Sequence, residues 1–437
     1  MSIPTLQGLQ TALSGLLAEQ QAVDVAGHNI ANANTEGYSR ERVVMHTNPA
    51  IEVPALSAHT GEGAQLGTGV SVETYLRIRN GYLDSQYRTQ NSAMNGAEAQ
   101  AEALQQAQGA FNEPSSSGIS SQLSAFWSAW SSLANAPTSE AAKQGVIAAG
   151  EQLARTLSQL NTQLATVSAD ATQQYESRAG ASGEVAEYAK QIAQLNGQIS
   201  LAEQAGQPPN DLLDRRDLLL DKLSALAQIS VTKQPDGTDT VTFGDAAKPL
   251  VEGTTANWPQ AITAAAGGQL GSLLALTGAG GQFAKYQSAL DTVASSLASS
   301  VNELHTTTPF FSGETAATLK VAVKAAEVQT SSKGTPGGND VALAITGLRG
   351  GAADQGYSSL IEQVGSDVRA AKGEATNLQA TVSAIGNQRQ SVSGVSMDEE
   401  MTNLISFQRG YQASARTLTV MDAMLETLIE HTGTAGL

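Results

Sequence analysis

The chain contains no cysteine and few aromatic or charged residues, and each shortage excludes a class of protein. Without cysteine there can be no disulfide, no thiolate nucleophile and no zinc site built on sulfur. Aromatic residues make up 4% and charged residues 15% of the 437 residues, while Ala, Ser, Gln, Thr and Gly fill long tracts. Small side chains suit thin helices packed side by side better than a wide interior. We therefore expect elongated helical bundles.

The chain also lacks positive charge and long apolar runs. It has 24 Lys and Arg against 41 Asp and Glu, a formal net charge of −17. This charge repels phosphate backbones and anionic lipid headgroups, which argues against nucleic-acid and membrane partners. No apolar run approaches the roughly 20 residues of a membrane-spanning helix. Because the first twenty residues also lack the pattern of a secretory signal peptide, we expect a soluble protein that does not use the general export route.

Apolar residues recur at alternating spacings of three and four near both chain ends, which predicts an amphipathic helix at each end. The N-terminal stripe comprises Leu6, Leu9, Leu13, Leu16, Gln20, Val23, Gly27 and Ile30. The C-terminal stripe comprises Leu404, Phe407, Tyr411, Ser414, Leu418, Met421, Leu425 and Leu428. Ser396 followed by Glu399 has the spacing of a capping box and places the start of the last helix. Two stripes of similar length at opposite ends predict a terminal helix pair.

Between these ends the same spacing predicts helices over most of the chain, most regularly from Tyr357 to Ile385 and also from Phe283 to Leu304. Residues 82–228 read as further helices broken by turn sequences. A hairpin is predicted around Pro-Asp-Gly at 235–237, where apolar residues alternate on both sides. Segments 248–252, 319–323 and 341–345 could add strands to it, and a short strand is expected at 69–75.

These elements predict a mainly α fold, with an elongated helical bundle or coiled coil formed by the N- and C-terminal segments and a small inserted β-rich domain. We expect three domains. The terminal helical assembly domain spans 1–45 and 395–437. The elongated helical domain, with short β segments, spans 46–228, 270–305 and 358–394. The β-rich domain spans 229–269 and 306–357.

The sequence offers no motif for catalysis, a cofactor or a metal. Neither a GxSxG motif nor a phosphate-binding loop is complete, so no activated serine or nucleotide site is expected. The histidines occur singly, and we expect structural roles for all five, namely His28, His46, His59, His305 and His431. No catalytic residue, cofactor or metal site is therefore predicted.

Charged and aromatic runs also have structural explanations. Asp398, Glu399 and Glu400 suit the first turn of a helix, where the macrodipole favours negative charge. The run DLLDRRDLLLDKL at 211–223 is typical of a solvated helix face, with Asp211 able to pair with Arg215. Phe126, Trp127 and Trp130 are expected to pack on a helix face.

The stretch HNIANANTEGYSRERV, residues 28–43, follows the first predicted helix. Asn and Gly tolerate the left-handed backbone region, and Asn side chains bond to nearby main chain, so this segment can end a helix and reverse the path. Generic helix termination does not require so many particular residues in a row.

Residues 13–43 closely resemble the start of the bacterial flagellar axial proteins, the family of rod, hook and hook-associated proteins. The shared pattern is a small-residue amphipathic helix followed by N-I-A-N-x-x-T-x-G-Y, and the Tyr38-Ser39-Arg40 continuation is similar to the hook-associated members. Residues 391–429 resemble the end of the same proteins. Segments LLDRRDLL, LDTVASSLASSVNELH and PFFSG match in order between them. The stretch from His305 to Phe310 is very short, so an outer domain of some members is expected to be absent or reduced.

The resemblance implies a structural subunit of the bacterial flagellum that polymerises at the hook–filament junction and connects hook to filament. It implies export through the flagellar type III apparatus to an extracellular location. The implied partners are further copies of the chain, the hook protein, the second hook–filament junction protein and a dedicated export chaperone that binds the C-terminal helix region. Terminal helices that cannot bury both faces within one subunit would order on packing with neighbours.

Within this interpretation two groups of residues are expected to mediate assembly. The first shapes the connection leaving the N-terminal helix and comprises Asn29, Asn32, Asn34, Gly37 and Tyr38. The second forms the helical seam and comprises Leu6, Leu9, Leu13, Leu16, Leu404, Phe407, Tyr411, Leu418, Met421, Leu425 and Leu428. Packing within one subunit is the competing explanation for any single member.

Three other functions remain open on the sequence. A flagellar hook or rod subunit would share the terminal helices, but the GYSR continuation and the long helical middle distinguish this chain from it. A type III secreted helical effector would be expected to carry a membrane-active apolar helix. A wall hydrolase would need a pair of convergent acids, which the sequence does not declare.

Overall fold

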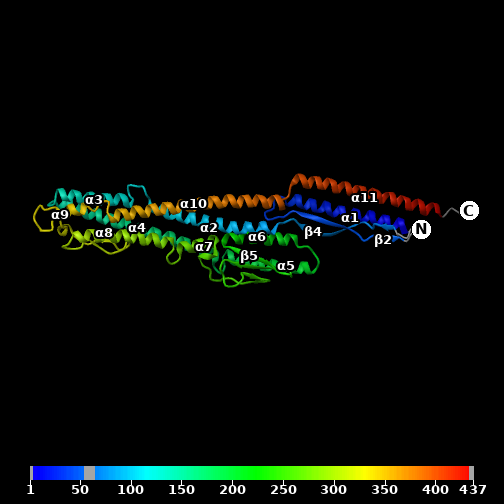
Figure 1. The fold of residues 1–437 in the computed structure, drawn as a ribbon, viewed down its shortest axis with the longest axis horizontal. Coiled ribbons are helices and arrows are strands. Elements are labelled where there is room, and N and C mark those ends of the chain that lie inside the picture. Colours follow the sequence, from blue (N-terminus) through cyan, green and yellow to red (C-terminus); the bar gives the residue numbers. More distant parts are fainter. Residues whose placement is uncertain (1–2, 54–63, 433–437) are drawn as a thin grey trace.

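The computed structural model of the chain is an elongated, mainly helical molecule with both termini at one end (Figure 1). It describes residues 3–53 and 64–432. Helices account for 67% of the structure, and the mainly α class with small sheets that the sequence predicts is confirmed. The helices are α1 (Ile3–Asn32), α2 (Gly81–Phe111), α3 (Ile119–Asn135), α4 (Glu140–Ala179), α5 (Glu184–Gln204), α6 (Asn210–Leu226), α7 (Gly268–Thr277), α8 (Gln282–Leu304), α9 (Asp340–Thr346), α10 (Ala352–Ser393) and α11 (Met397–Thr432).

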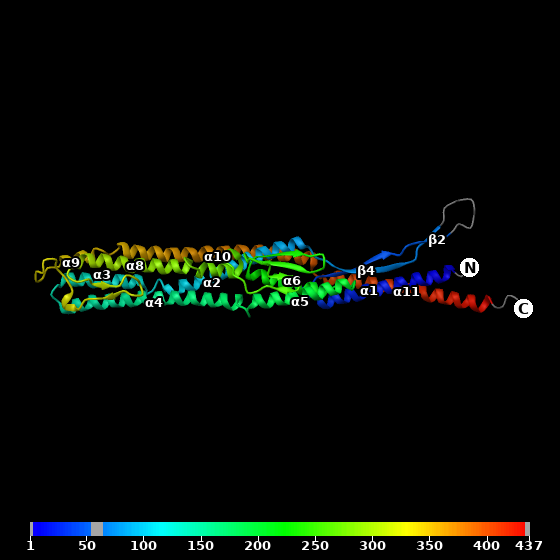
Figure 2. The same cartoon turned by 90° about the horizontal axis from the view of Figure 1, so that it is seen from below.

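The strands form small antiparallel sheets beside these helices. They are β1 (Glu41–Thr47), β2 (Ile51–Val53), β3 (Ala64–Leu66), β4 (Val70–Arg77), β5 (Ile229–Lys233), β6 (Asp239–Phe243), β7 (Val251–Glu252), β8 (Thr255–Ala256), β9 (Phe311–Ser312) and β10 (Lys320–Val321). The ribbon of β1 and β4 runs next to α1, and β2 continues away from the helices (Figure 2). The strand expected at 69–75 is therefore present as β4.

Helices α1 and α11 lie side by side, which confirms the predicted terminal pair (Figure 1). The face of α1 that is buried, however, consists of small residues and not of the predicted leucine stripe. Its buried apolar side chains are Ala12, Ala18, Ala22 and Ala26, and a side-chain atom added to Gly8 or Gly15 would meet α11 at Met421 or Ser414. Small residues allow two helices to approach closely. Leu13 consequently stays 44% exposed.

The far part of the molecule is a shaft made of α2, α3, α4, α8 and α10, with one continuous apolar core. The stripes predicted on α8 and α10 are confirmed, because Leu290, Leu297, Val364 and Val368 are all buried in it. The expected packing role of the aromatic group is also confirmed. Phe126, Trp127 and Trp130 are at most 2% exposed and form a cluster with two further rings, those of Phe310 and Phe311.

A second core lies between α5, α6 and the four-stranded sheet β5-β6-β7-β8. The predicted hairpin is confirmed, with Val231 opposite Val241, and Gly237 takes a left-handed φ of 79° in its turn. The strand expected within 248–252 is present as β7 and pairs with β6.

Two other strand expectations were wrong. Residues 320–321 form β10, but they pair with β9 and not with the hairpin. Residues 341–345 lie in helix α9, where Val341, Ala342 and Ile345 are buried at helical spacing. A short apolar run fits either a strand or a buried helix, and only its neighbours decide between them. The division into three domains stays a prediction.

Truncating a shaft residue should destabilise the shaft core. Leu153 in α4 is fully buried, so Leu153→Ala should lower the free energy of unfolding of this core by about 2–5 kcal/mol. Urea unfolding followed by tryptophan fluorescence in a Trp258→Phe background measures this, since Trp127 and Trp130 then report on the shaft alone. Leu201→Ala, at a 69% exposed position, is the control and should change stability by less than about 0.5 kcal/mol.

Candidate functional site

The most heavily bonded polar region lies where the terminal helices meet the shaft, and we call it the joint. It comprises Asn29, the loop 33–40, Glu41, the end of β4 with the two residues after it (77–79), residues 210–221 of α6, and the break between α10 and α11 at 394–396. Segments more than 350 residues apart in sequence are linked here by hydrogen bonds. The joint therefore fixes how the terminal pair is connected to the rest of the chain.

Asn29 is the central residue of the joint and is 1% exposed. Its Nδ2 donates to the Glu41 carbonyl oxygen at 2.9 Å and to Glu400 Oε2 at 3.1 Å. Its Oδ1 accepts from the Glu41 N–H at 2.9 Å and from the Tyr38 hydroxyl at 2.7 Å. All four bonds that one amide side chain can make are thus formed. They join the end of α1 to the start of β1 and to the first turn of α11.

The loop after α1 uses the turn chemistry that the sequence predicts. Asn32 is the last residue of α1, and its Nδ2 donates to the His28 carbonyl oxygen while its Oδ1 accepts from Thr35. Gly37 has a left-handed φ of 82°, and a Cβ there would lie 3.1 Å from the Cβ of Leu218 in α6. A larger residue would be strained at this position and would also crowd α6.

Ser39 and Arg40 attach the loop to three helices. The Ser39 N–H and hydroxyl donate to Asp214 of α6 at 2.9 and 2.7 Å. The Arg40 N–H donates to the Ser393 carbonyl oxygen at the end of α10. Its guanidinium makes two hydrogen bonds to Glu399 of α11, at 3.0 and 2.9 Å. Arg40 therefore spans the break between α10 and α11.

Glu400 completes this arrangement from the first turn of α11. Its side chain is 3% exposed, and its Oε1 lies 2.8 Å from Arg40 Nε, an ion pair whose angle does not suit a hydrogen bond. The acids at 398–400 were expected to serve only the helix dipole. That explanation is incomplete, because Glu399 and Glu400 both bind Arg40. The position of these acids in the helix did not reveal that the Arg40 guanidinium would lie against Glu399 and Glu400.

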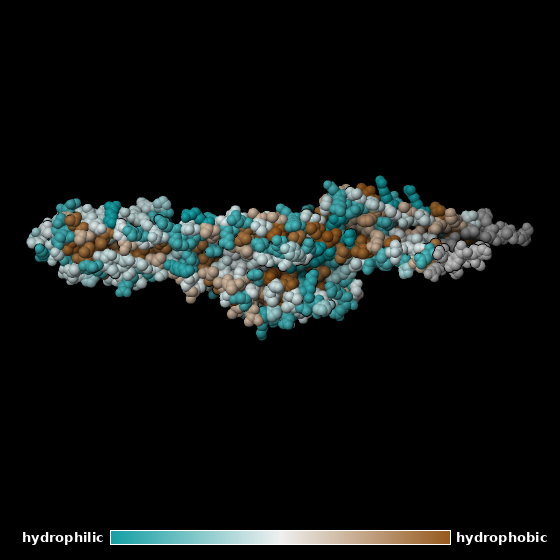
Figure 3. Space-filling view, viewed as in Figure 1, coloured by the Kyte–Doolittle hydropathy of each residue, from teal (hydrophilic) through white to brown (hydrophobic). Residues whose placement is uncertain are grey.

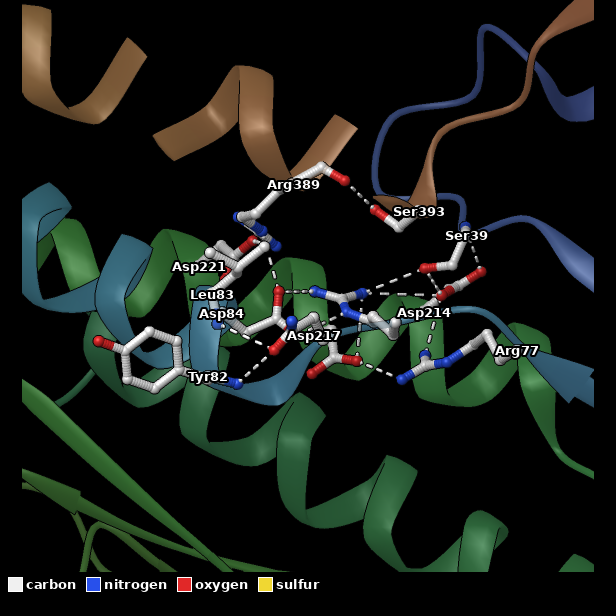
Figure 4. A network of polar contacts seen from close by, with 12 residues as sticks. Ser39, Arg77, Tyr82, Leu83, Asp84, Asp214, Asp217, Asp221, Arg389 and Ser393 are labelled. Carbon is white, nitrogen blue, oxygen red and sulfur yellow. Dashed lines mark hydrogen bonds and ion pairs between the residues drawn. The ribbon is translucent and has the colours of Figure 1, made fainter. Parts of the chain in front are cut away.

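Aspartates of α6 form a second part of the joint with arginines from β4 (Figure 4). Arg77 binds Asp214 at 2.9 Å and Asp217 at 2.6 Å. Arg79 binds Asp84 at 2.9 Å and Asp217 at 3.2 Å. Arg77 ends β4 and Arg79 lies two residues along the chain, and both side chains reach the same face of α6 because each of them binds Asp217.

Arginines from α2 and α10 extend this network to the shaft. Arg88 binds Asp217 and Asp221 at 2.9 and 2.7 Å. Arg389 binds Asp84 and Asp221 at 2.9 and 2.8 Å, and its guanidinium lies 4.3 Å from the ring centroid of Tyr87. Four arginines thus face four aspartates, so the positive and negative charges of the network balance. One network ties β4, α2, α6 and α10 together.

The prediction that 211–223 is a solvated helix face was wrong. Asp214 is 6% exposed, Arg216 is 4% exposed and pairs with Asp239, and the expected pair of Asp211 with Arg215 does not occur in the described part of the chain. Positions 214, 217 and 221 share one side of a helix, as the spacing of three and four requires. The spacing does not reveal whether that side meets water or arginines distant in sequence.

Burial and charge act in opposite directions on the acids of the network. Burial alone would raise the pKa of Asp217, but the charges of Arg79, Arg77 and Arg88 hold that pKa well below its usual range. Burial raises the pKa of Asp214, and Arg77 and the bonds from Ser39 offset only part of that rise. Of Asp214 and Asp217, Asp217 is thus the more strongly stabilised anion, as its contacts with three arginines imply.

The structure brings part of the predicted assembly set into the joint and leaves the rest on the terminal helices. Asn29, Gly37 and Tyr38 lie in the joint, Asn32 ends α1 directly before its loop, and Asn34 is an exposed member of that loop. The partly buried members on the helices are Leu9, Leu16, Leu404, Phe407, Leu418, Met421 and Leu425, while Leu13 and Tyr411 are exposed. Leu6 and Leu428 belong to α1 and α11, but their side chains lie outside the described residues.

The sequence-based search missed the arginines of the joint. A usable signal existed in the Arg-x-Arg alternation at 77–79 and in the i, i+3, i+7 spacing of Asp214, Asp217 and Asp221. His59 and the His431 side chain lie outside the described residues. Within those residues no helix combines the length and hydrophobicity that crossing a membrane requires. Because Arg77, Arg79, Arg88 and Arg389 are paired with aspartates, the joint is suited to holding segments at fixed positions.

Removing the amide of Asn29 should destabilise the joint strongly. Asn29→Ala leaves the Glu41 N–H and carbonyl and the Tyr38 hydroxyl without their partner, which should cost about 3 kcal/mol. Hydrogen exchange at the Glu41 amide should accelerate by about two orders of magnitude. Asn34→Ala at the exposed neighbouring position is the matched control, and an equal effect of both substitutions would contradict the central role of Asn29.

Asp217 should make stability depend on acid pH. Because its pKa is lower in the folded than in the unfolded chain, its contribution is fully present above the unfolded value of about 3.9 and is lost as the pH falls through the folded value. The stability difference between the wild type and Asp217→Asn should therefore shrink below about pH 4. Urea unfolding at a series of pH values measures it. Asp170→Asn, at an exposed site on α4, should differ little from the wild type throughout.

Three family models match separate parts of the chain. Residues 104–264 match the flagellar hook-associated protein FlgK helical domain. Residues 9–38 match the flagella basal body rod protein family, and residues 387–430 match the C-terminal region of the flagellar basal body rod FlgEFG proteins. The last two matches cover most of α1 and α11, together with part of the joint.

Individual relatives carry the same names. The chain is 24% identical to the flagellar hook junction protein FlgK from Burkholderia pseudomallei, whose structure aligns with a TM-score of 0.44 over 51% of this chain and 43% of that one. It is 30% identical to flagellar hook-associated protein 1 of Escherichia coli (strain K12), over 59% of this chain and 45% of that protein. It is 30% identical to flagellar hook-associated protein 1 of Bacillus subtilis (strain 168), and this alignment covers 99% of both chains. The chain therefore belongs to the flagellar hook-associated protein 1 family.

Proposed function

We propose that this chain is a structural subunit of the bacterial flagellum that polymerises at the hook–filament junction and connects hook to filament. The observation that carries the proposal is an exposed apolar surface on the terminal helix pair, in a chain of the hook-associated family. A surface of this kind on a single subunit is a candidate interface.

The outer face of α11 contains large apolar residues where a solvated helix would have polar ones. Met401, Ile405, Val420 and Met424 are between 48% and 58% exposed, and none of them belongs to the predicted stripe from Leu404 to Leu428. Figure 3 shows hydrophobic residues at the surface where the terminal helices leave the shaft. An amphipathic helix with apolar residues on both faces requires a second packing partner.

Helix α1 also exposes apolar side chains. Its small residues pack inside the subunit, which leaves Leu13 and Leu17 at 44% and 49% exposed. Burying the exposed half of one such leucine stabilises an assembly by about 1 kcal/mol. Because α1 and α11 lie at one end of an elongated molecule, copies can gather by these helices around an axis while their shafts extend from it (Figure 1). The predicted division into terminal, shaft and β-rich domains is kept in this proposal.

The joint has a mechanical part in this assembly. It holds α11 to the loop after α1 through Arg40 and holds the shaft to α6 through Arg389. Paired, buried charges resist displacement because separating them leaves a charge without a partner. Force applied to the terminal helices would thus reach the shaft through defined side chains and not through a flexible linker.

The proposed partners follow from this location. They are further copies of the chain, the hook protein, the second junction protein and an export chaperone for the C-terminal helix, with export through the flagellar type III apparatus to the cell exterior. The terminal residues named from the sequence remain the proposed assembly residues. Asn29 is buried, so its proposed role is to hold the joint in place and not to contact another subunit. We propose no enzymatic activity, since the four arginines and four aspartates of the network are engaged with one another.

A hook or rod subunit is the second candidate. The matches of residues 9–38 and 387–430 to rod-protein families favour it, because those segments are the proposed assembly helices. The two functions differ in position along the flagellum. Immunogold labelling at one narrow band between hook and filament supports the junction subunit, whereas labelling along the hook or below it supports the alternative.

Polar substitution of the outer face should block assembly without unfolding the subunit. We expect the double variant Ile405→Gln, Val420→Gln to keep the melting temperature of the monomer within about 3 °C, because both side chains are half-exposed. In a strain that lacks the native gene, this variant should yield hooks without attached filaments in electron micrographs. Leu201→Gln, at the 69% exposed position on α5, should restore filaments. Normal filaments with the double variant would refute the proposed interface.

A further inference from the structure

Three side chains with metal-binding atoms converge beside the joint, although the sequence contains no metal motif. They are His28 near the end of α1, Glu41 at the start of β1 and Asp211 in the first turn of α6. One ring nitrogen of His28 and one carboxylate oxygen from each acid all lie within 4.8 Å of one another. His28 and Asp211 also line a surface depression of about 340 Å³, which gives an ion access from solvent.

The hydrogen bonds around His28 leave the imidazole in a form that can bind a cation. The Tyr38 hydroxyl donates its one proton to Asn29 Oδ1 at 2.7 Å, and the orientation of that amide is fixed by its bonds to Glu41 and Glu400. The same hydroxyl lies 3.1 Å from His28 Nδ1, so it must accept the proton of Nδ1. Nε2 of the neutral ring then keeps its lone pair. An N–H donated to an outer oxygen is the usual support of a metal-binding histidine.

Glu41 supplies a buried anion at the same place. Glu41 is 9% exposed, and its carboxylate is hydrogen-bonded to the side chain of Asn210. The amide of Asn210 also donates to the Tyr75 carbonyl oxygen. Burial raises the pKa of Glu41, and the nearby charges of Asp211 and Asp214 raise it further. The arginines close to Asp214 are engaged with the aspartates of α6. Arg215 also lines the depression, and its positive charge repels a cation. An ion would therefore have to be bound by direct ligands, because the depression does not offer a uniformly negative surface.

We propose that His28, Glu41 and Asp211 bind one divalent transition-metal ion. One imidazole and two carboxylates are ligands of the zinc, cobalt and nickel class, whereas calcium and magnesium prefer oxygen alone. Three protein ligands leave at least one coordination position for water. The ion would bridge α1, β1 and α6, which meet in the joint, and would reinforce the attachment of the terminal helices to α6.

Titration of the full chain, produced without a histidine tag, tests the proposal. Isothermal titration calorimetry with zinc chloride should give saturable binding of one ion per chain. Asp211→Asn removes an exposed carboxylate and should weaken binding by about tenfold or more, as should His28→Gln. His46→Gln changes a histidine outside the cluster, whose Nε2 lies 3.1 Å from the Ser71 hydroxyl, and should leave the affinity unchanged. Cobalt absorption spectra of the wild type should show bands that Asp211→Asn loses.

Two results would overturn the proposal. One is the absence of saturable zinc binding by the wild-type chain. The other is equal binding by the wild type, Asp211→Asn and His46→Gln. That result would mean that the measured zinc binding comes from scattered surface carboxylates. Because Asp211 and Arg215 are both exposed, Asp211→Asn should fold normally, and its circular dichroism and melting temperature verify this. The outcome does not depend on flagellar assembly, so it is separate from the test of the junction function.

Discussion

The buried contact between Asn29, Arg40 and Glu400 is the constraint on which the arrangement of this molecule depends. A buried charge or amide is tolerated only when each of its polar atoms has a partner, and here those partners come from opposite ends of the chain. Each misplaced segment would leave a charge unpaired. The direction of α11 after the break at 394–396 is therefore set by side chains from the loop after α1.

The balance of arginines and aspartates extends this constraint toward the shaft. Arg77 and Arg79 of β4 meet the same face of α6 that Arg389 reaches from α10. Replacing such a network by apolar groups often costs little stability, so its value lies in geometry and not in the strength of folding. A subunit with the proposed junction function needs a defined angle between its assembling helices and its body. The joint provides the groups that define it.

The scarcity of aromatic residues shapes the rest of the molecule. Several large rings gather around Trp127 and Trp130 at the far end of the shaft, and aliphatic side chains, mainly alanine, leucine and valine, make up most of the remaining shaft core. Small residues are most prominent in the contact between the terminal helices, where Ala18 and Ala22 lie on the buried face of α1. Close packing of small residues turns the leucines outward. The surface proposed to mediate polymerisation thus arises from the way the subunit's own helices pack.

The sequence by itself determined the helices, the hairpin at 229–243 and the turn at Asn32 and Gly37, because periodicity and backbone preference act over a few neighbouring residues. Only the tertiary structure decided which face of α1 is buried, that residues 341–345 form a helix, and that Asp214 and Asp217 meet arginines. These outcomes depend on residues far away in the chain. A local pattern records which residues share a face but not what that face will meet.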